Sequence, residues 1–422
     1  MEEKNNTLYI DDASTTYLAE KYGTPLYVYS VSEIKDRIGE LKKDFLNKYE
    51  NTTVSYASKA FLTKAMAKLI SDEGINLDVV SGGELYIALS AKFPPERIEF
   101  NGNNKLYDEI ELAVKNNVGK IIIDGASELP MIEEAAKKYN KKVNVLYRVT
   151  PGIDAHTHEY ISTGKLDSKF GFPIDEVIGE VKKANASEYV NFIGYHFHIG
   201  SQLFENDIYL KALDIVFKLI EDTISEIGEN IQELNIGGGF GITYTDEKRP
   251  PFSFFLEPIM NKINTYFNSK NLKRPIITIE PGRSVVGEAG YTLYTVGSIK
   301  NVEGIRKYVA IDGGMTDNIR PALYDAKYRA IVANNVNGSN LETVTICGKC
   351  CESGDIIITD AEIPATNTGD LICIPSTGAY GYSMSSNYNS LLKPAIVFVE
   401  KGKDTLVLKR QTYKDLVRND VV

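Results

Sequence analysis

The chain has 422 residues, of which 43% are hydrophobic and 25% charged, and its formal net charge is −10 at pH 7. This length exceeds that of a usual single domain, so we expect one barrel-sized domain and a smaller one. The acidic balance argues against a nucleic acid or an anionic membrane as a partner. The N-terminus resembles no leader peptide, and no segment is apolar enough to span a bilayer, so we expect a cytoplasmic protein that acts on a small molecule.

The four cysteines are Cys347, Cys350, Cys351 and Cys373. They are too few and too clustered for a secreted disulfide framework, so we expect reduced thiols. Cys347 and Cys350 form a C-x-x-C motif, which could be half of a zinc site or a redox pair. No second C-x-x-C or distant histidine pair completes four ligands, and we therefore expect no metal at these cysteines.

Short β-rich runs alternate with amphipathic helical stretches from about residue 52 to residue 283. Eight β/α units in about 230 residues is the size and number of a closed barrel. We therefore expect an α/β fold with a (β/α)8 TIM-type barrel over residues 33–283. The eight expected strands lie at 53–58, 75–81, 97–102, 120–125, 143–150, 190–200, 231–239 and 275–283.

Residues 284–422 contain strands without long helices, which is typical of a mostly antiparallel second domain. Residues 1–32 precede the barrel and contain two further β-rich runs, LYIDD and PLYVYS. We expect this opening segment to add strands to the second domain.

Catalytic side chains of a β/α barrel sit at the C-terminal ends of its strands, because the loops there converge on one mouth. The chemically versatile residues of this chain occupy those positions on seven of the expected strands. In chain order they are Lys59, residues 81–84, residues 101–105, Arg148, His196 with His198, residues 237–239, and residues 280–283.

Glycines 237, 238, 239 and 241 lie in GGGFG, directly after an expected strand. No helix is expected immediately afterwards, which argues against a dinucleotide-binding turn. Glycine amides can instead cradle a phosphate, and barrels commonly bind phosphate after strands seven and eight. Lys59 at the same mouth is more often a surface lysine, but its amine could bind a phosphorylated aldehyde such as pyridoxal phosphate (PLP).

The four histidines form two H-x-H pairs, His156 with His158 and His196 with His198. Both rings of such a pair face one side of a strand, which is compatible with a zinc site. The alternative interpretation is that the His198 ring stacks on a planar cofactor. Glu280 could pair with Arg283, or hold the nitrogen of a pyridine cofactor protonated and so make the ring an electron sink.

Taken together, these strings resemble the fold-type III PLP-dependent decarboxylases, which include the ornithine, arginine and diaminopimelate decarboxylases. The resemblance covers nearly the whole chain. It rests on YASKA, DVVSGGEL, NGNNK, STGKLDSKFG, HFHIGSQ, GGGFG and EPGR in the barrel, and on DGGMTDNIRPALYDA, CESGD and GAYGYSMSSNYN beyond it.

The resemblance implies that PLP is the cofactor, that Lys59 carries it, that His198 stacks on its ring and that Glu280 holds its nitrogen. The phosphate and its surroundings would be bound by Ser201, Gly237, Gly238, Gly239, Gly282, Arg283 and Tyr380. Arg283, Arg320, Tyr324 and Tyr380 would bind the distal carboxylate end of the substrate, and Glu352 its distal ammonium. Cys351 would be the proton donor, reaching into the partner subunit's site in a homodimer.

The second-domain strings are most similar to the diaminopimelate decarboxylase branch, which implies decarboxylation of meso-2,6-diaminopimelate to L-lysine and CO2. The alternatives are a carboxynorspermidine, ornithine or arginine decarboxylase, a non-catalytic regulator on the same fold, and a metal-dependent barrel hydrolase that uses His196 and His198. A bidentate guanidinium suits a distal carboxylate, and a lone carboxylate suits an ammonium, which favours diaminopimelate.

Overall fold

The computed structural model describes residues 1–153 and 168–421 and forms two compact units. His156, His158 and the start of the STGKLDSKFG string lie outside the described residues. One unit comprises residues 38–241 and 249–284, and the other comprises residues 1–37, 242–248 and 285–422. Residues 242–248 were expected within the barrel range, but Ile242 and Tyr244 belong to the apolar core of the second unit.

Eight parallel strands close into a barrel in the first unit, as the sequence predicts. The ring closes where β8 (Lys120–Ile123) pairs with β9 (Val143–Thr150), and the short β10 (Phe172–Pro173) also pairs with β9. In ring order the strands are β9 (Val143–Thr150), β11 (Val190–His196), β12 (Glu233–Asn235), β13 (Ile276–Ile279), β5 (Thr52–Ala57), β6 (Asn76–Val79), β7 (Ile98–Phe100) and β8 (Lys120–Ile123).

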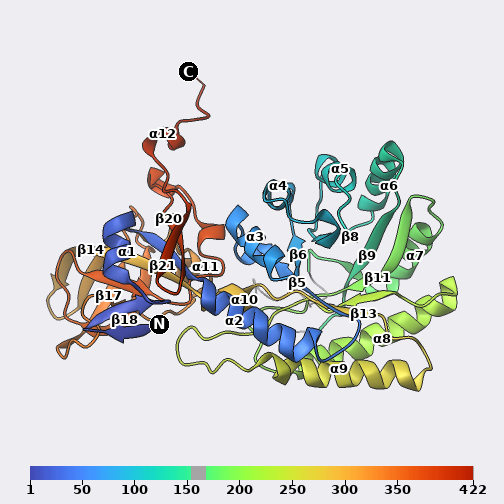
Figure 1. Ribbon diagram of the computed structural model, residues 1–422, viewed down its shortest axis with the longest axis horizontal. Helices are drawn as coiled ribbons and strands as arrows, with labels where there is room; N and C mark the ends of the chain where they lie inside the picture. Colours follow the sequence, from blue (N-terminus) through green and yellow to red (C-terminus); the bar gives the residue numbers. More distant parts are fainter. Residues whose placement is uncertain (154–167, 422) are drawn as a thin grey trace. The chain divides into compact units, whose positions relative to one another are not determined.

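Helices with apolar residues at helical spacing cover the barrel strands, and Figure 1 shows α3 to α6 on one side of the strands and α8 and α9 on the other. Helix α3 begins after Thr63, whose hydroxyl accepts a hydrogen bond from the backbone amide of Met66. Helix α8 ends at Gly228, which adopts a left-handed φ of 77°. The barrel helices are α3 (Lys64–Asp72), α4 (Gly82–Ser90), α5 (Tyr107–Lys115), α6 (Glu128–Tyr139), α7 (Ile174–Asn185), α8 (Asp207–Ile227) and α9 (Phe252–Ser269).

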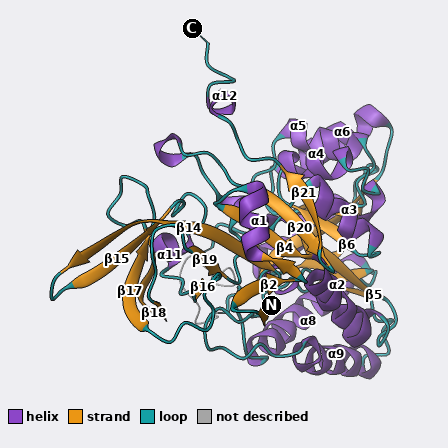
Figure 2. Ribbon diagram, turned by 60° about the vertical axis from the view of Figure 1, so that its left-hand side comes forward, coloured by secondary structure: helices purple, strands orange, loops and turns teal. Residues whose placement is uncertain are grey.

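A mostly antiparallel sheet forms the second unit, as predicted. Within the residues that the structure describes, its parallel pairs are β15 with β17 and β4 with β20. Figure 2 shows β15, β17 and β18 side by side. The order is β18 (Ile356–Pro364), β17 (Leu341–Cys347), β15 (Arg306–Ile311), β14 (Gly290–Val302), β4 (Leu26–Ser30), β20 (Ala395–Glu400) and β21 (Lys403–Leu408), with β19 (Leu371–Ile374) on β14 and β16 (Ile331–Val332) on β19.

The remaining elements are a small sheet and further helices. A three-stranded sheet near the N-terminus consists of β1 (Glu2–Lys4), β2 (Thr7–Ile10) and β3 (Ala13–Ser14). The other helices are α1 (Thr15–Tyr22), α2 (Val31–Leu41), α10 (Arg283–Val286), α11 (Arg320–Tyr324) and α12 (Tyr413–Leu416). None of the helices in the described part of the chain has the length and apolar character needed to cross a membrane.

Candidate active site

Glu280 follows the last residue of β13 and lies at the centre of a buried hydrogen-bond network at the barrel mouth. One carboxylate oxygen accepts hydrogen bonds from the side-chain amides of Asn235 (2.8 Å) and Asn101 (3.1 Å), and the other lies 3.0 Å from Nε2 of His196. Asn101, Asn235 and His196 all stand at the ends of their strands. The closed barrel therefore brings together side chains that are far apart in the sequence.

The environment at the mouth shifts the pKa values of two carboxyl groups, Asp78 and Glu280, in opposite directions. Burial raises the pKa of Asp78 to about 7, and the nearby Glu280 carboxylate adds to this rise. Burial also opposes ionisation of Glu280, but the charge and hydrogen bond of His196 and the charge of Lys59 hold its pKa well below the usual value. At neutral pH Glu280 is therefore an ionised, buried carboxylate, which suits a protonated ring nitrogen.

Lys59 lies in a single 3-10 turn, Ser58–Ala60, directly after β5. Its amine is 3.5 Å from Oδ2 of the fully buried Asp78, while 37% of the lysine side chain is exposed. The amine is thus held at the mouth and is accessible to a ligand. Ser81, Gly82 and Glu84 do not contribute a second reactive cluster, because Ser81 caps α4 and Glu84 accepts hydrogen bonds from Ser58 (2.7 Å) and the amide of Val80 (2.8 Å).

The glycine run after β12 packs tightly against its neighbours. A Cβ atom at Gly238 would lie 2.1 Å from the Glu280 carbonyl oxygen, and one at Gly239 would lie 2.4 Å from that of Gly200. The Gly238 amide donates to Nδ1 of His198 at 3.2 Å, so this nitrogen is an acceptor. Burial and the charge of Lys59 lower the pKa of His198 well below its usual value, which makes it a neutral ring able to stack.

Ser201 and Arg283 meet at the same mouth. The Arg283 guanidinium donates to the Ser201 hydroxyl from Nη2 at 3.0 Å and from Nε at 3.3 Å. A guanidinium beside a hydroxyl is a suitable pair for a phosphate. Gly282, next to Arg283, approaches Ala57 and Ala60 so closely that a Cβ atom there would lie 3.0 Å and 3.2 Å from their Cβ atoms.

His196 and His198 do not form a metal cluster in the described part of the chain. The one group of three potential metal ligands found there consists of Asp78, Glu99 and Glu280, all buried. Sequence reasoning missed Asp78, Glu99 and Asn235. A polar residue inside or at the end of an otherwise apolar strand could have revealed Asp78 and Asn235. Glu99 gives no such signal, because the alternation of its strand predicts that it faces water.

In the β-rich unit, Arg320 begins α11 and is buried among aromatic rings. Its Nη1 donates to the Tyr328 hydroxyl at 2.5 Å, and its guanidinium carbon lies 4.7 Å from the Tyr244 ring centroid. Its buried Nε has no hydrogen-bond partner among the described residues. A buried cation with an unused donor is suited to bind an anion such as a carboxylate.

The other predicted residues of this unit lie in loops and short helices. Cys351 and Glu352 are exposed in the hairpin between β17 and β18, and the Cys351 amide donates to Oδ1 of Asn389 at 2.6 Å. Tyr324 ends α11, and Tyr380 is half-buried with a left-handed φ of 59°, which is uncommon for a large side chain. Burial and nearby Asp355 raise the pKa of the Cys350 thiol to about 11, which makes it unreactive.

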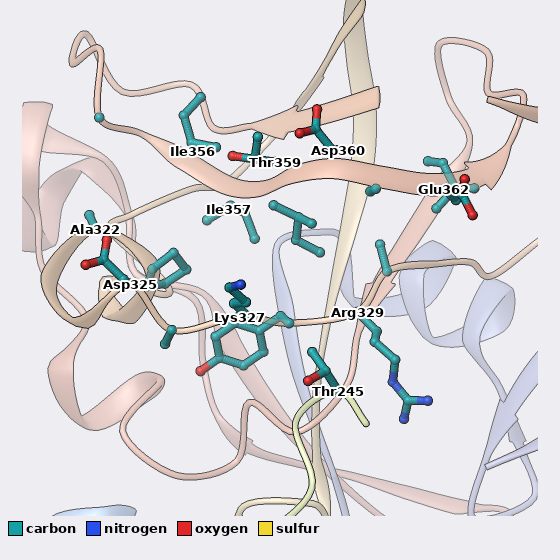
Figure 3. A pocket seen from close by; sticks show the side chains of 18 residues that line it. Thr245, Ala322, Asp325, Lys327, Arg329, Ile356, Ile357, Thr359, Asp360 and Glu362 are labelled. Carbon is teal, nitrogen blue, oxygen red and sulfur yellow. The ribbon is translucent and has the colours of Figure 1, made fainter. Parts of the chain in front are cut away.

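A cavity of about 800 Å³ lies in the β-rich unit between β18 and residues 321–330. Figure 3 shows charged side chains on both walls, with Lys327 and Arg329 across from Asp360 and Glu362. None of the predicted site residues lines this cavity. Its size therefore does not make it the active site.

The closed barrel, the lysine at its mouth and the ionised Glu280 define a class of protein, the barrel enzymes that process a small molecule with a bound cofactor. Residues 32–287 match the family model described as "Pyridoxal-dependent decarboxylase, pyridoxal binding domain". The diaminopimelate decarboxylase of Bacillus subtilis is 47% identical over 100% of this chain and 96% of that protein. The one from Staphylococcus aureus is 44% identical over 99% of this chain and 98% of that protein.

A solved structure of the M. jannaschii diaminopimelate decarboxylase in co-complex with L-lysine superposes with a TM-score of 0.93 at 37% identity, over 100% of this chain and 97% of that chain. The Helicobacter pylori diaminopimelate decarboxylase complexed with L-lysine has a TM-score of 0.88 at 33% identity, over 96% and 98%. The chain belongs to the pyridoxal-dependent decarboxylases and, within them, to the diaminopimelate decarboxylase family.

PLP is the cofactor of this family, and the mouth fits it. The ionised Glu280 matches a protonated pyridine nitrogen, the neutral His198 suits a planar ring, and the amine of Lys59 is accessible. Ser201 and Arg283 offer donors for a phosphate. The amides of Gly237 and Gly238 donate within the chain, to Asn235 and His198, so they position these side chains in the present structure.

Proposed function

We propose that this chain decarboxylates meso-2,6-diaminopimelate at its D-centre, releasing CO2 and L-lysine. The observation that carries the proposal is the similarity to diaminopimelate decarboxylases over the entire chain. Bound PLP would supply the electron sink for the pair left by the breaking carbon–carbon bond. The neutral His198 and the ionised Glu280 support this, since one would pack on the ring and the other would keep its nitrogen protonated.

We assign the remaining roles to residues of this chain in the same proposal. Lys59 would hold the cofactor through its amine, with Ser201, Gly237, Gly238, Gly239, Gly282, Arg283 and Tyr380 around the phosphate. Arg320, with Arg283, Tyr324 and Tyr380, would bind the carboxylate of the L-centre, and Glu352 its ammonium. Cys351 would deliver the proton to the carbon that has lost CO2, because a thiol can act as a general acid.

Substrate choice is supported by the buried guanidinium of Arg320. A simple diamino acid such as ornithine has no distal carboxylate, and Arg320 with an unused Nε would then be left without an anion. We therefore expect CO2 release from meso-diaminopimelate and little from L-ornithine, L-arginine or carboxynorspermidine. A panel assay with these four amino acids tests this, and equal or faster turnover of a substrate without a distal carboxylate would reject it.

A homodimer with shared sites is part of the proposal. Cys351 and Glu352 are exposed within a single chain, whereas a proton donor must be shielded from water to act on one carbon. Among the described residues, the strand β18 also lies at the edge of its sheet and pairs with β17 alone. Sedimentation at working concentration tests the dimer, and a fully active monomer would exclude it.

A reduced thiol at Cys351 also favours a cytoplasmic location.

A further inference from the structure

The hairpin between β17 and β18 carries Cys351 and Glu352 in its loop, and a buried carboxylate holds the backbone just before them. The side chain of Asp355 accepts hydrogen bonds from the backbone amides of Met315 (2.6 Å) and Cys350 (2.8 Å). These two bonds fix the loop as far as residue 350. The direction of the Cys351 side chain therefore depends on a further contact.

That contact comes from Asn389, which lies 38 residues further along the chain. Oδ1 of Asn389 accepts a hydrogen bond from the backbone amide of Cys351 at 2.6 Å. Because the peptide group is planar, fixing this N–H direction also fixes the peptide plane that precedes the Cα atom of Cys351. The hydrogen bond thus limits the directions in which the thiol can point.

The backbone at Asn389 has an unusual conformation that directs its side chain to the hairpin. Asn389 has a φ of 52° and the next residue, Ser390, has a φ of 57°. Left-handed backbone is uncommon outside glycine and asparagine, so two such residues in succession need support from their surroundings. The Ser390 amide donates to the Asn387 carbonyl at 2.8 Å, and the Asn387 side chain donates to the Leu391 carbonyl at 2.6 Å. The corner is therefore held in place by its own loop.

The loop that carries Asn389 shares an anchor with the hairpin. The Ser386 amide donates to the carbonyl oxygen of Thr316 at 3.0 Å. Thr316 follows Met315, whose amide is one of the two held by Asp355. Both loops are thus attached to the same segment of the β-rich unit, so the fold determines the distance between them.

We propose that Asn389 is a positioning residue for the decarboxylation: its side chain orients the Cys351 thiol for proton transfer. The inference rests on the proposed function, in which the S–H bond of Cys351 breaks and its proton bonds to the carbon that has lost CO2. The electron pair left by CO2 forms the new C–H bond, and the thiolate regains a proton from solvent water. The competing explanation is that asparagine occupies position 389 only because it tolerates a left-handed backbone.

Glycine and aspartate at position 389 separate these explanations. Asn389→Gly keeps the left-handed backbone without strain but removes the acceptor, whereas Asn389→Asp retains an acceptor oxygen. With the PLP-loaded, full-length protein we expect Asn389→Gly to lower kcat for meso-diaminopimelate at least about tenfold and to change KM less than about threefold, because misplacing a reacting group is costly. Asn389→Asp should keep kcat within about threefold of the wild type. A purely conformational role predicts that glycine is at least as good as aspartate.

A double-mutant cycle tests whether Asn389 acts through Cys351. In the Cys351→Ala background the thiol is absent, so adding Asn389→Gly should change kcat by less than about twofold. Independent effects would instead multiply and slow the double variant at least about tenfold further. Asn140→Gly is the matched control, because Asn140 also has a left-handed backbone, with a φ of 50°, at the end of α6. It should leave kcat unchanged.

Hydrogen exchange of the peptide that spans residues 348–354 gives a readout that does not depend on turnover. The Cys351 amide loses its acceptor in Asn389→Gly and should exchange faster than in the wild type. The exchange rate in Asn389→Asp and in Asn140→Gly should match that of the wild type. Unchanged exchange in Asn389→Gly would contradict the hydrogen bond on which the inference depends.

A wild-type kcat in Asn389→Gly, or multiplying losses in the cycle, would overturn the inference. Equal losses of kcat in the glycine and aspartate variants would do so as well, since the acceptor oxygen would then make no difference. Failure of the proposed function has a different signature, because it appears in proteins that retain Asn389. The wild type would then release no CO2 from diaminopimelate, or Cys351→Ala would retain the wild-type kcat.

Discussion

Replacement of Arg320 by lysine separates charge from geometry at the proposed carboxylate site. Lysine keeps one positive charge but cannot make the hydrogen bond of Nη1 to Tyr328 and also present a second, parallel donor to a carboxylate. We expect weaker binding of every ligand that carries the L-centre carboxylate, which includes the product L-lysine. PLP binding should stay unchanged, because Lys59 and Glu280 are intact.

The magnitude follows from the burial of the guanidinium. Truncating one partner of a buried, hydrogen-bonded charge pair costs about 2–5 kcal/mol, and lysine retains part of the attraction, so about 2 kcal/mol is expected. That corresponds to a rise of about thirtyfold in KM for meso-diaminopimelate and in the inhibition constant of L-lysine. The loss of the contact with the Tyr244 ring and of the Tyr328 hydrogen bond should also lower the unfolding free energy by about 1–2 kcal/mol.

Steady-state kinetics with meso-diaminopimelate and inhibition by L-lysine measure the effect. Arg329→Lys is the control, because Arg329 is an exposed arginine in the loop that follows α11, and it should leave both constants unchanged. Wild-type values of KM and of the L-lysine inhibition constant in Arg320→Lys would refute the role of Arg320 and, with it, the structural argument for a distal carboxylate.

Three further predictions concern the mouth and the hairpin. Lys59→Ala should abolish borohydride trapping of PLP on the protein without changing the circular dichroism of the fold, and trapping on another lysine would move the site. Mixed dimers of Lys59→Ala and Cys351→Ala subunits should regain activity that neither variant has alone, because one of the two shared sites is then intact; no recovery would contradict shared sites. The lowered pKa of Glu280 contributes stability that is fully present above its unfolded pKa of about 4.3 and is lost as the pH falls through the folded pKa. The melting temperature of the cofactor-free wild type should therefore fall more steeply below about pH 4 than that of Glu280→Gln, and parallel curves would contradict an ionised Glu280.

The barrel could be predicted from the sequence because its strands and helices have clear periodicities and regular spacing. Lys59, Glu280, Ser201 and Arg283 could be placed at one mouth because strand ends converge there. Their individual contacts, such as Arg283 with Ser201, depend on loop conformations that no periodicity encodes. The roles assigned to these residues stay predictions until tested.

The charged interior could not be predicted, for a physical reason that Glu99 illustrates. Glu99 stands between Ile98 and Phe100, and in an isolated strand this alternation predicts that the glutamate faces water. The closed ring instead leaves Glu99 1% exposed and beside Lys120 of the next strand. Only the closure of the barrel determines which face is the interior, and the partners of Glu99 come from β8 and β12.

The position of β4 in the second unit affects how the chain folds during synthesis. Its residues leave the ribosome early, yet Leu26 pairs with Leu293 on one side and with Ala395 on the other, both in the last third of the chain. All strands of the barrel precede residue 284, so the barrel can close while β4 still lacks its partners. In the last step of folding, β4, which is synthesised early, then pairs with β14 and β20, which are synthesised late. Pairing between strands so far apart in the sequence is intrinsically slow. During that interval β4 has unpaired strand edges, which are prone to pair with other chains and aggregate.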